Sequence, residues 1–281
     1  MTTENKDGSD YWNGPQGQNW VRFQEELDAV FADVTRMVLD QSELRTGENV
    51  LDIGCGTGAH TLAAADHVGE AGACIGVDIS APLVKLAKER AGDRTNVTFT
   101  LADAQTAGLP DKRFDIVTSR FGVMFFDDPP AAFANIATAL KPGGRMVFGA
   151  WGPVPQNPWW HLPSRIAAER LGPVPAPPPN SPGPMGLSNV DYVRDVFQNA
   201  GLSHIEIATI TAHLTHPDGA AGAASLSVNV GAAARVLDYY EAPEIDRTAV
   251  RDALAEAYAT HEVDGTLRIP AAINVISARI A

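Results

Sequence analysis

The chain has 281 residues, 45% of them hydrophobic and 20% charged, and its formal net charge is −13. This is the composition of a globular protein, and the length suits one sizeable domain with insertions. The acidic balance argues against a nucleic-acid partner, which needs a basic surface, and no apolar run reaches the length of a membrane span. The polar start, MTTENKDGSDYW, lacks the layout of a signal peptide, so a cytoplasmic protein is expected.

The first half of the chain is predicted to alternate between strands and helices. Residues 1–10 are expected to be disordered, and apolar residues then recur at helical spacing from Trp20 to Val38. Further apolar runs predict strands at 49–53, 74–79, 97–101, 114–119 and 145–150, helices at 60–68, 81–92 and 129–140, Ser80 as a helix N-cap, and a turn at 141–144. This alternation indicates an α/β fold with a parallel sheet covered on both faces.

The pattern changes at residue 151. More than half of the twenty prolines lie in residues 151–184, which predicts a long irregular insertion without a continuous helix. Beyond it we expect a helix from about Ser188 to Gly201, a strand at 205–209, a helix at 249–258 and a last strand at 273–280. Four segments follow: an N-terminal tail and helix that belong to a substrate cap (1–44), a core (45–151), the Pro-rich insertion (152–187), and the rest of the sheet (188–281) with a helical insertion at 217–265.

Residues 50–58, Val-Leu-Asp-Ile-Gly-Cys-Gly-Thr-Gly, form the most informative motif. A buried strand leads through Gly54, Gly56 and Gly58 into a helix, and glycine lets a ligand lie against bare backbone at the free N–H groups of that helix. Twenty residues further on, Asp78 ends the next strand, where a carboxylate can accept hydrogen bonds from the two hydroxyls of a ribose. The pattern predicts a nucleoside-bearing ligand at this junction.

With four further stretches, this motif resembles the class I S-adenosylmethionine-dependent methyltransferases, in particular the small-molecule branch of ubiquinone- and menaquinone-biosynthesis-type enzymes. The matching stretches are 50–58, 76–80, 101–104, 114–119 and 140–150. The resemblance covers about residues 45–151, the expected cofactor-binding core. It implies a doubly wound, mostly parallel seven-stranded sheet in the order 3-2-1-4-5-7-6, the last strand antiparallel, with helical and irregular cap insertions. It also implies in-line transfer of a methyl group from S-adenosyl-L-methionine to a small-molecule acceptor.

The resemblance further implies which residues bind the cofactor. The glycine loop lies against the methionine part with Asp52 below it, Asp78 binds the ribose, Ile79 packs on the adenine and Asp103 accepts from the adenine amino group. The full implied set is Asp52, Gly54, Cys55, Gly56, Gly58, His60, Asp78, Ile79, Asp103, Ala104, Arg120 and Phe121.

Several of these residues have an ordinary structural alternative. Asp52 at a strand end is more often structural than catalytic, and Cys55 suits a small buried hydrophobe. His60 could cap a helix or face solvent. Asp78 could be a surface carboxylate, and Asp103 a helix cap.

All five tryptophans lie in two windows outside the predicted sheet. These are Trp12 and Trp20 in the first window, and Trp151, Trp159 and Trp160 in the second. We expect them to meet over the cofactor and to bind the acceptor, since aromatic faces stack on flat molecules and stabilise cations. The alternative is that they only attach the N-terminal helix and the insertion to the domain.

His161 is the first candidate for a general base and Tyr11 the second, although an ordinary surface or hydrogen-bonded histidine is the favoured interpretation of His161. His213 and His216 have no third ligand near them in sequence, so no metal site is expected.

Two other functions remain open at this point. A nicotinamide-dependent oxidoreductase shares the strand–glycine–helix motif, but the single residue between Gly56 and Gly58 argues against a pyrophosphate loop. A non-catalytic module that only binds S-adenosylmethionine is the other. The sequence does not indicate the acceptor, the methylated atom or the oligomeric state, for which a homodimer is one option.

Overall fold

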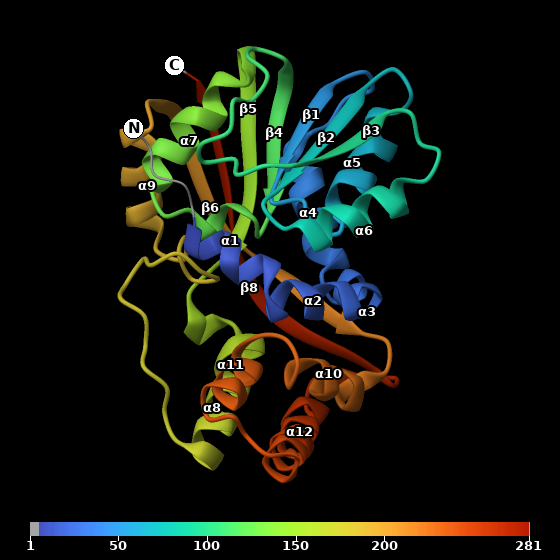
Figure 1. Ribbon diagram of the computed structural model, residues 1–281, viewed down its shortest axis with the longest axis vertical. Coiled ribbons are helices and arrows are strands. Elements are labelled where there is room, and N and C mark those ends of the chain that lie inside the picture. Colours follow the sequence, from blue (N-terminus) through green and yellow to red (C-terminus); the bar gives the residue numbers. More distant parts are fainter. Residues whose placement is uncertain (1–5, 281) are drawn as a thin grey trace.

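The computed structural model describes residues 6–280 and contains one mixed β-sheet (Figure 1). Its strands follow the order β3-β2-β1-β4-β5-β8-β6, and a short strand, β7, pairs with β8 beside them. β1 to β5 pair in parallel, whereas β8 runs antiparallel between β5 and β6. The predicted order is confirmed, with β8 in the seventh place. The bounds are β1 Asn49–Ile53, β2 Ala73–Asp78, β3 Val97–Leu101, β4 Phe114–Arg120, β5 Leu140–Trp151, β6 Leu202–His216, β7 Glu262–Val263 and β8 Thr266–Ile280.

Helices cover both faces of the sheet. α4 packs on β4, β5 and β6, α5 packs on β1 and β2, and α6 packs on β2 and β3. α7 contacts α9, which packs on β6. The central strands are buried on both faces, as continuous apolar runs in parallel strands require. The bounds are α4 Ala32–Ser42, α5 Ala59–Val68, α6 Ala81–Ala91, α7 Pro129–Thr138 and α9 Val190–Asn199.

Three short helices, α1 (Lys6–Asn13), α2 (Pro15–Arg22) and α3 (Gln24–Val30), cross the middle of the molecule beneath the sheet (Figure 1). The expectation of disorder is therefore wrong for residues 6–10, which belong to α1, while residues 1–5 lie outside the described residues. Contacts with α6 and the turn before it hold α1 and α2 in place, and local composition does not report such contacts.

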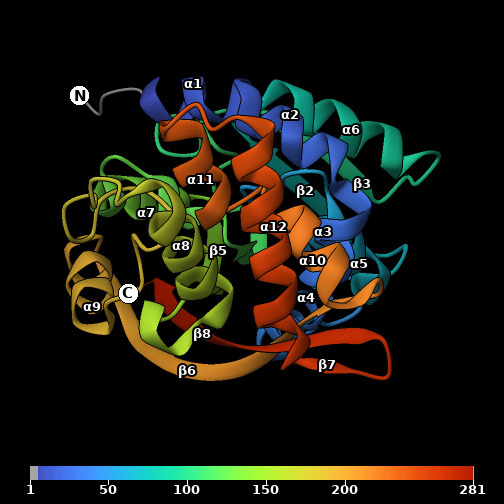
Figure 2. The same ribbon diagram turned by 90° about the horizontal axis from the view of Figure 1, so that it is seen from below.

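A second group of helices lies on the far side of α1–α3 and forms a cap (Figure 2). It consists of α8 (Pro158–Leu171), α10 (Gly219–Ser227), α11 (Ala232–Tyr239) and α12 (Glu244–Ala259). Among the described residues, no single helix is long and apolar enough to cross a membrane, and one bent pair, α10 with α11, passes that test only by length and composition.

α8 contradicts the expected absence of a continuous helix in the Pro-rich insertion. Pro158 stands in its first turn, where the missing N–H has no partner to lose, and Pro163 lies inside it. Burial of Trp159 and Ala167 against the cap outweighs the cost of Pro163. The longer irregular part is the segment that follows the helix, and a shorter one with a single 3₁₀ turn precedes it.

β6 and β8 are longer than predicted and reach from the sheet down to the cap (Figure 1). Their distal halves pack against α3, α10 and α12, so neighbours from elsewhere in the chain set their length. Residues 141–144, expected as a turn, belong instead to β5, whose pairing with β4 has a register shift at this point.

Candidate active site

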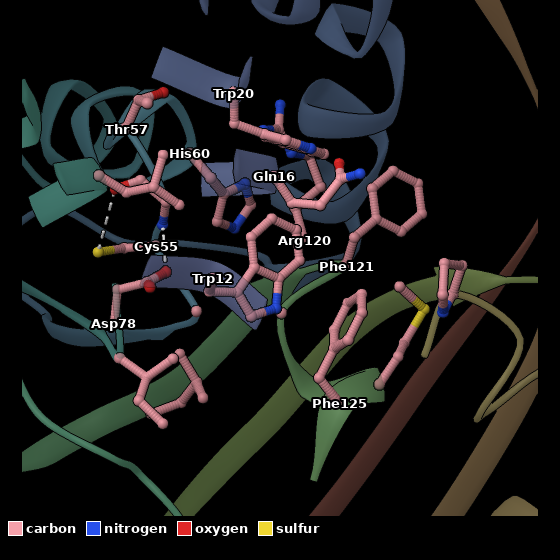
Figure 3. Close-up of a pocket in the computed structure, with 18 of the residues that line it drawn as sticks. Trp12, Gln16, Trp20, Cys55, Thr57, His60, Asp78, Arg120, Phe121 and Phe125 are labelled. Atoms are coloured by element: carbon pink, nitrogen blue, oxygen red, sulfur yellow. Dashed lines mark hydrogen bonds between the residues drawn. The ribbon is translucent and has the colours of Figure 1, made fainter. Parts of the chain in front are cut away.

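One cavity lies between the carboxyl edge of the sheet, the N-terminal helices and the cap (Figure 3). The ends of β1 to β5 supply one wall, α1 to α3 supply the second, and the cap with its loops supplies the third. Ligands of open α/β sheets bind at this edge. Of the predicted cofactor residues, all but Asp52 and Gly58 line the cavity: Gly54, Cys55, Gly56, His60, Asp78, Ile79, Asp103, Ala104, Arg120 and Phe121.

The three glycines of the loop have different roles. A Cβ on Gly54 would lie 2.5 Å from the Cα of Gly122, and a Cβ on Gly58 would lie 2.8 Å from the ring of Phe99. A Cβ on Gly56 would meet no atom within 4 Å, although its φ of +55° disfavours other residues. Gly54 and Gly58 therefore allow close packing, whereas Gly56 leaves bare backbone facing open space.

Asp78 joins this loop to the turn after β2. Its Oδ2 accepts a hydrogen bond from the Gly56 N–H at 2.7 Å (Figure 3), and its Oδ1 accepts one from the Ser80 N–H at 2.9 Å. Burial raises the pKa of the carboxyl group above its ordinary value, although these backbone donors oppose the shift. The group is a fixed acceptor at the wall of the cavity rather than a surface carboxylate.

Asp103 lines the cavity and also holds a turn. Its Oδ1 accepts from the Gln105 N–H and its Oδ2 from the Thr106 hydroxyl, both at 2.9 Å. The helix cap that the sequence left as an alternative is not observed, because the residues that follow Asp103 form a turn and not a helix. The turn does not remove the carboxylate from the wall.

Asp52 and His60 are buried polar groups under the loop. Asp52 accepts a hydrogen bond from the Thr61 hydroxyl at 2.6 Å through Oδ2, and its Oδ1 has no partner. Burial raises the pKa of Asp52 to about 7. Nε2 of His60 lies 3.0 Å from the Thr118 hydroxyl, its Nδ1 has no partner, and burial lowers its pKa to about 3. Neither expected alternative for His60, a helix cap or a solvent-facing ring, is observed.

Arg120 brings a buried cation to the same region. Its Nη1 donates to the Thr35 hydroxyl at 2.9 Å, and its guanidinium lies over the ring of Phe31 at 5.5 Å. Its Nε is buried without a partner, and burial lowers its pKa from the ordinary value. A buried guanidinium with an unused N–H is complementary to an anion.

All five tryptophans line the cavity, so the two sequence windows do meet in space. Trp12 packs edge-to-face on Trp20 at 5.6 Å. Trp151 packs in the same manner on Trp160 at 5.4 Å. Trp159 lines the cavity and also stacks on Tyr258 of α12 at 6.0 Å, which combines the two roles that the sequence left open.

Phe121 has a strained backbone at the end of β4. Its φ of +68° is unusual for a non-glycine residue, and such conformations cluster at functional sites. Its ring stacks on Trp151 with centroids 4.5 Å apart and an angle of 3° between the planes. The two rings therefore pack face to face at the ends of β4 and β5, where both line the cavity.

The structure separates the two candidate bases. Tyr11 lines the cavity although the residue is 49% exposed, and partial burial of its phenol raises its pKa. His161 is on α8 beside Trp160 but is not among the described residues that line the cavity. In the described part of the chain, no three His, Cys, Asp or Glu side chains are grouped in a way that could hold a metal ion.

Sequence reasoning missed several wall residues. Asp28 of α3 lines the cavity and accepts hydrogen bonds from Gln24 at 2.6 Å and from Arg90 at 2.5 Å. Arg90 also donates to the Thr57 carbonyl at 2.7 Å, which ties α3 to the glycine loop. No local pattern distinguishes Asp28 from other acidic residues. Phe125, which also lines the cavity, lies in the apolar run directly after β4, and that position could have marked it as a candidate.

The sheet order, with an antiparallel strand between β5 and β6, and the glycine loop with its acidic partner define the Rossmann-like fold of methyltransferases. The comparisons agree with this class. The family model for a methyltransferase domain matches residues 51–148.

Two relatives extend the match. Nocamycin O-methyltransferase of Saccharothrix syringae is 31% identical over 219 residues, which cover 76% of this chain and 69% of that protein. Aklanonic acid methyltransferase of a Streptomyces species is 40% identical over 120 residues, which cover 42% of this chain and 54% of that protein.

A solved structure agrees in fold. Phosphoethanolamine N-methyltransferase 2 of Haemonchus contortus, bound to S-adenosylhomocysteine, has a TM-score of 0.58 at 18% identity, with 99% of this chain and 60% of that chain covered. The chain belongs to the class I S-adenosylmethionine-dependent methyltransferases that act on small molecules. S-adenosyl-L-methionine is the methyl donor of this family, so neither the nicotinamide-dependent alternative nor the non-catalytic module is retained.

Proposed function

We propose that this protein methylates an oxygen atom of a flat, largely apolar small molecule. In this proposal the cofactor lies along the glycine loop and Asp78, and the acceptor lies between the tryptophans. The observation that carries the proposal is that the glycine loop, Asp78 and all five tryptophans line one cavity.

The residues at the sheet edge fit the cofactor. Gly56 offers open backbone, and Asp78 is held rigidly where a ribose would need an acceptor. The methionine end of S-adenosylmethionine carries both an ammonium and a carboxylate. Arg120 lines the cavity, and its buried Nε has no partner, so we propose it as a donor to the carboxylate. Asp52 lies behind the cavity wall, so we propose that it supports the loop from below rather than touching the ammonium. We propose Ile79, Asp103 and Ala104 for the adenine.

The other side of the cavity fits an aromatic acceptor. The ring of Phe121 stacks face to face on Trp151, and Trp12 and Phe125 meet edge-to-face at 5.2 Å. Such walls bind planar molecules through their faces and exclude water. We therefore propose Trp12, Trp20, Trp151, Trp159 and Trp160 as acceptor-binding residues.

The choice of an oxygen nucleophile rests on chemistry and on the relatives. S-adenosylmethionine supplies an activated methyl group on a sulfonium, so the protein needs to orient the nucleophile and exclude water. His60 is a poor base because its pKa is about 3, and His161 lies outside the cavity wall. Tyr11 is the one candidate base from the sequence that lines the cavity.

An acceptor that ionises unaided, such as a carboxylic acid or an acidic enol, suits this arrangement. One relative is named an O-methyltransferase and another acts on an acid by name, which is the reason for preferring oxygen.

Isothermal titration calorimetry with S-adenosylhomocysteine and with NADH tests the cofactor half of the proposal. We expect saturable binding of S-adenosylhomocysteine and none of NADH. Turnover of S-adenosylmethionine against a panel of aromatic carboxylic acids, phenols, amines and thiols tests the acceptor half. Methylation of the amines or thiols alone would contradict the oxygen assignment.

A further inference from the structure

The turn between α1 and α2 is joined to the turn between β2 and α6. Nδ2 of Asn13 donates to the Ile79 carbonyl at 3.1 Å, and its Oδ1 accepts from the Ala81 N–H at 2.8 Å. The Ser80 hydroxyl donates to the Trp12 carbonyl at 2.7 Å. Three hydrogen bonds thus connect segments that are more than sixty residues apart in sequence.

At this junction the first free N–H of α6 is capped by Asn13 of α1 and not by the residue at the N-cap position of α6. Ser80 occupies the N-cap position of α6, yet its side chain makes no capping hydrogen bond. Asn13 instead supplies the acceptor for a free N–H of that helix. Gly17 completes the fit, because a Cβ there would overlap the Trp12 carbonyl that Ser80 binds.

This junction fixes Trp12 where the two halves of the cavity meet. The Trp12 backbone is held by the turn that directly follows Asp78, on the proposed cofactor side. Its ring packs against Phe125 at 5.2 Å and Trp20 at 5.6 Å, on the proposed acceptor side. Figure 3 shows the ring between Asp78 and Phe125.

We infer that Asn13 is a positioning residue that holds the α1–α2 segment closed over the bound cofactor and sets Trp12 as the common wall of both ligand sites. The inference rests on the proposed function. Asn13 itself is exposed and does not line the cavity, so its effect passes through Trp12 and the helix it anchors. Lifting of this segment would open the cofactor side of the cavity, and the two hydrogen bonds from Asn13 to the turn before α6 resist that motion.

The test is the dissociation rate of S-adenosylhomocysteine, followed by stopped-flow tryptophan fluorescence on the full chain. Asn13→Ala removes both hydrogen bonds to the turn before α6, together with the local bonds from Asn13 to Ser9 within α1, and we expect the rate to rise about fivefold with an unchanged melting temperature. Asn13→Asp keeps an acceptor for the Ala81 N–H and should give an intermediate rate. Asn199→Ala, an exposed asparagine at the end of α9, is the matched control and should leave the rate unchanged.

A double variant tests the junction itself. Ser80→Ala breaks the third hydrogen bond, and because both changes release the same segment, the double variant should dissociate little faster than the faster single variant. A dissociation rate within twofold of wild type in folded Asn13→Ala overturns the inference, and so does full additivity in the double variant. Failure of the wild type to bind S-adenosylhomocysteine would instead contradict the proposed function.

Discussion

The Gly56 N–H donates to Oδ2 of Asp78 across 2.7 Å, so the carboxylate that ends β2 holds the open centre of the loop that follows β1. The two most informative features of the sequence are therefore one structural unit. The other carboxylate oxygen of Asp78, Oδ1, accepts a hydrogen bond from the Ser80 N–H, so both oxygens are held at the wall of the cavity.

Asp78→Asn keeps the shape of this side chain and removes its charge. We expect the affinity for S-adenosylhomocysteine to fall by about tenfold or more, because hydrogen bonds to a charged acceptor contribute about 1.5–3 kcal/mol. Calorimetric titration measures the change, and Asp93→Ala, an exposed change in the loop after α6, is the control. An unchanged dissociation constant would remove Asp78 from the cofactor site.

Substitution of Gly58 should mainly lower the stability of the protein, whereas substitution of Gly56 should mainly lower its affinity for the cofactor. Gly58→Ala places a methyl group 2.8 Å from Phe99, so we expect it to lower the free energy of unfolding by about 2 kcal/mol or more. The new methyl group of Gly56→Ala would meet no atom within 4 Å, so only the positive φ of this residue destabilises the variant, by about 1 kcal/mol. The methyl group would, however, occupy space proposed for the cofactor. Urea unfolding and calorimetry together distinguish them. The separate roles would be contradicted if both variants lost cofactor affinity in the same proportion to their loss of unfolding free energy.

Asp52 and His60 should give opposite pH dependences of stability. The pKa of Asp52 is raised to about 7, so its contribution is present at low pH and is lost as the pH rises from about 4 to about 7. The pKa of His60 is lowered to about 3, so its contribution is present above about 6.5 and is lost as the pH falls toward 3. In the wild type the two effects oppose each other over the same range.

We therefore expect His60→Gln to make stability fall with rising pH between about 4 and 6.5, and Asp52→Asn to make it rise, each by an amount on the order of 2–4 kcal/mol. Unfolding curves in urea at several pH values measure both slopes. Parallel slopes in the two variants would contradict the assignment.

Trp159 and Trp160 are neighbours with different expected effects. Trp159 is 7% exposed and stacks on Tyr258, so Trp159→Ala should destabilise the fold by about 3–5 kcal/mol. Trp160 is only partly buried and packs on Trp151 in the cavity wall, so Trp160→Ala should mainly raise KM for the acceptor. Steady-state kinetics with the acceptor from the turnover panel, beside a thermal melt, checks both. An unchanged acceptor KM in folded Trp160→Ala would leave that side chain as packing only.

His161 should be dispensable for the reaction. Because it does not line the cavity, we expect His161→Ala to keep turnover within about twofold of wild type, whereas a general base contributes about 10²–10⁴-fold. The measurement is kcat under saturating cofactor. Tyr11→Phe, which removes the phenol that does line the cavity, is the informative companion. A loss of a hundredfold in His161→Ala alone would restore the sequence-based assignment.

Sequence patterns worked best where chemistry and backbone geometry are local. The alternating apolar runs predicted β1 to β5, because parallel strands between two helical layers need nothing but apolar side chains. They failed for α8, where Trp159 finds its partner Tyr258 about a hundred residues away, and for the distal half of β6, which packs on α3. Those elements depend on neighbours that no local window contains.

By itself the sequence determined the donor site, because a glycine turn, its helix and the next strand end are brought together by the βαβ unit that encodes them. Only the tertiary structure decided the rest of the cavity. In the folded chain Asp52, Gly58 and His161 do not line the cavity. Trp12, Trp151 and Trp160 do line it, although they come from distant parts of the sequence. The physical reason is that the acceptor walls come from the ends of β4 and β5, the N-terminal helices and α8, whose meeting is set by the packing of their buried faces against one another.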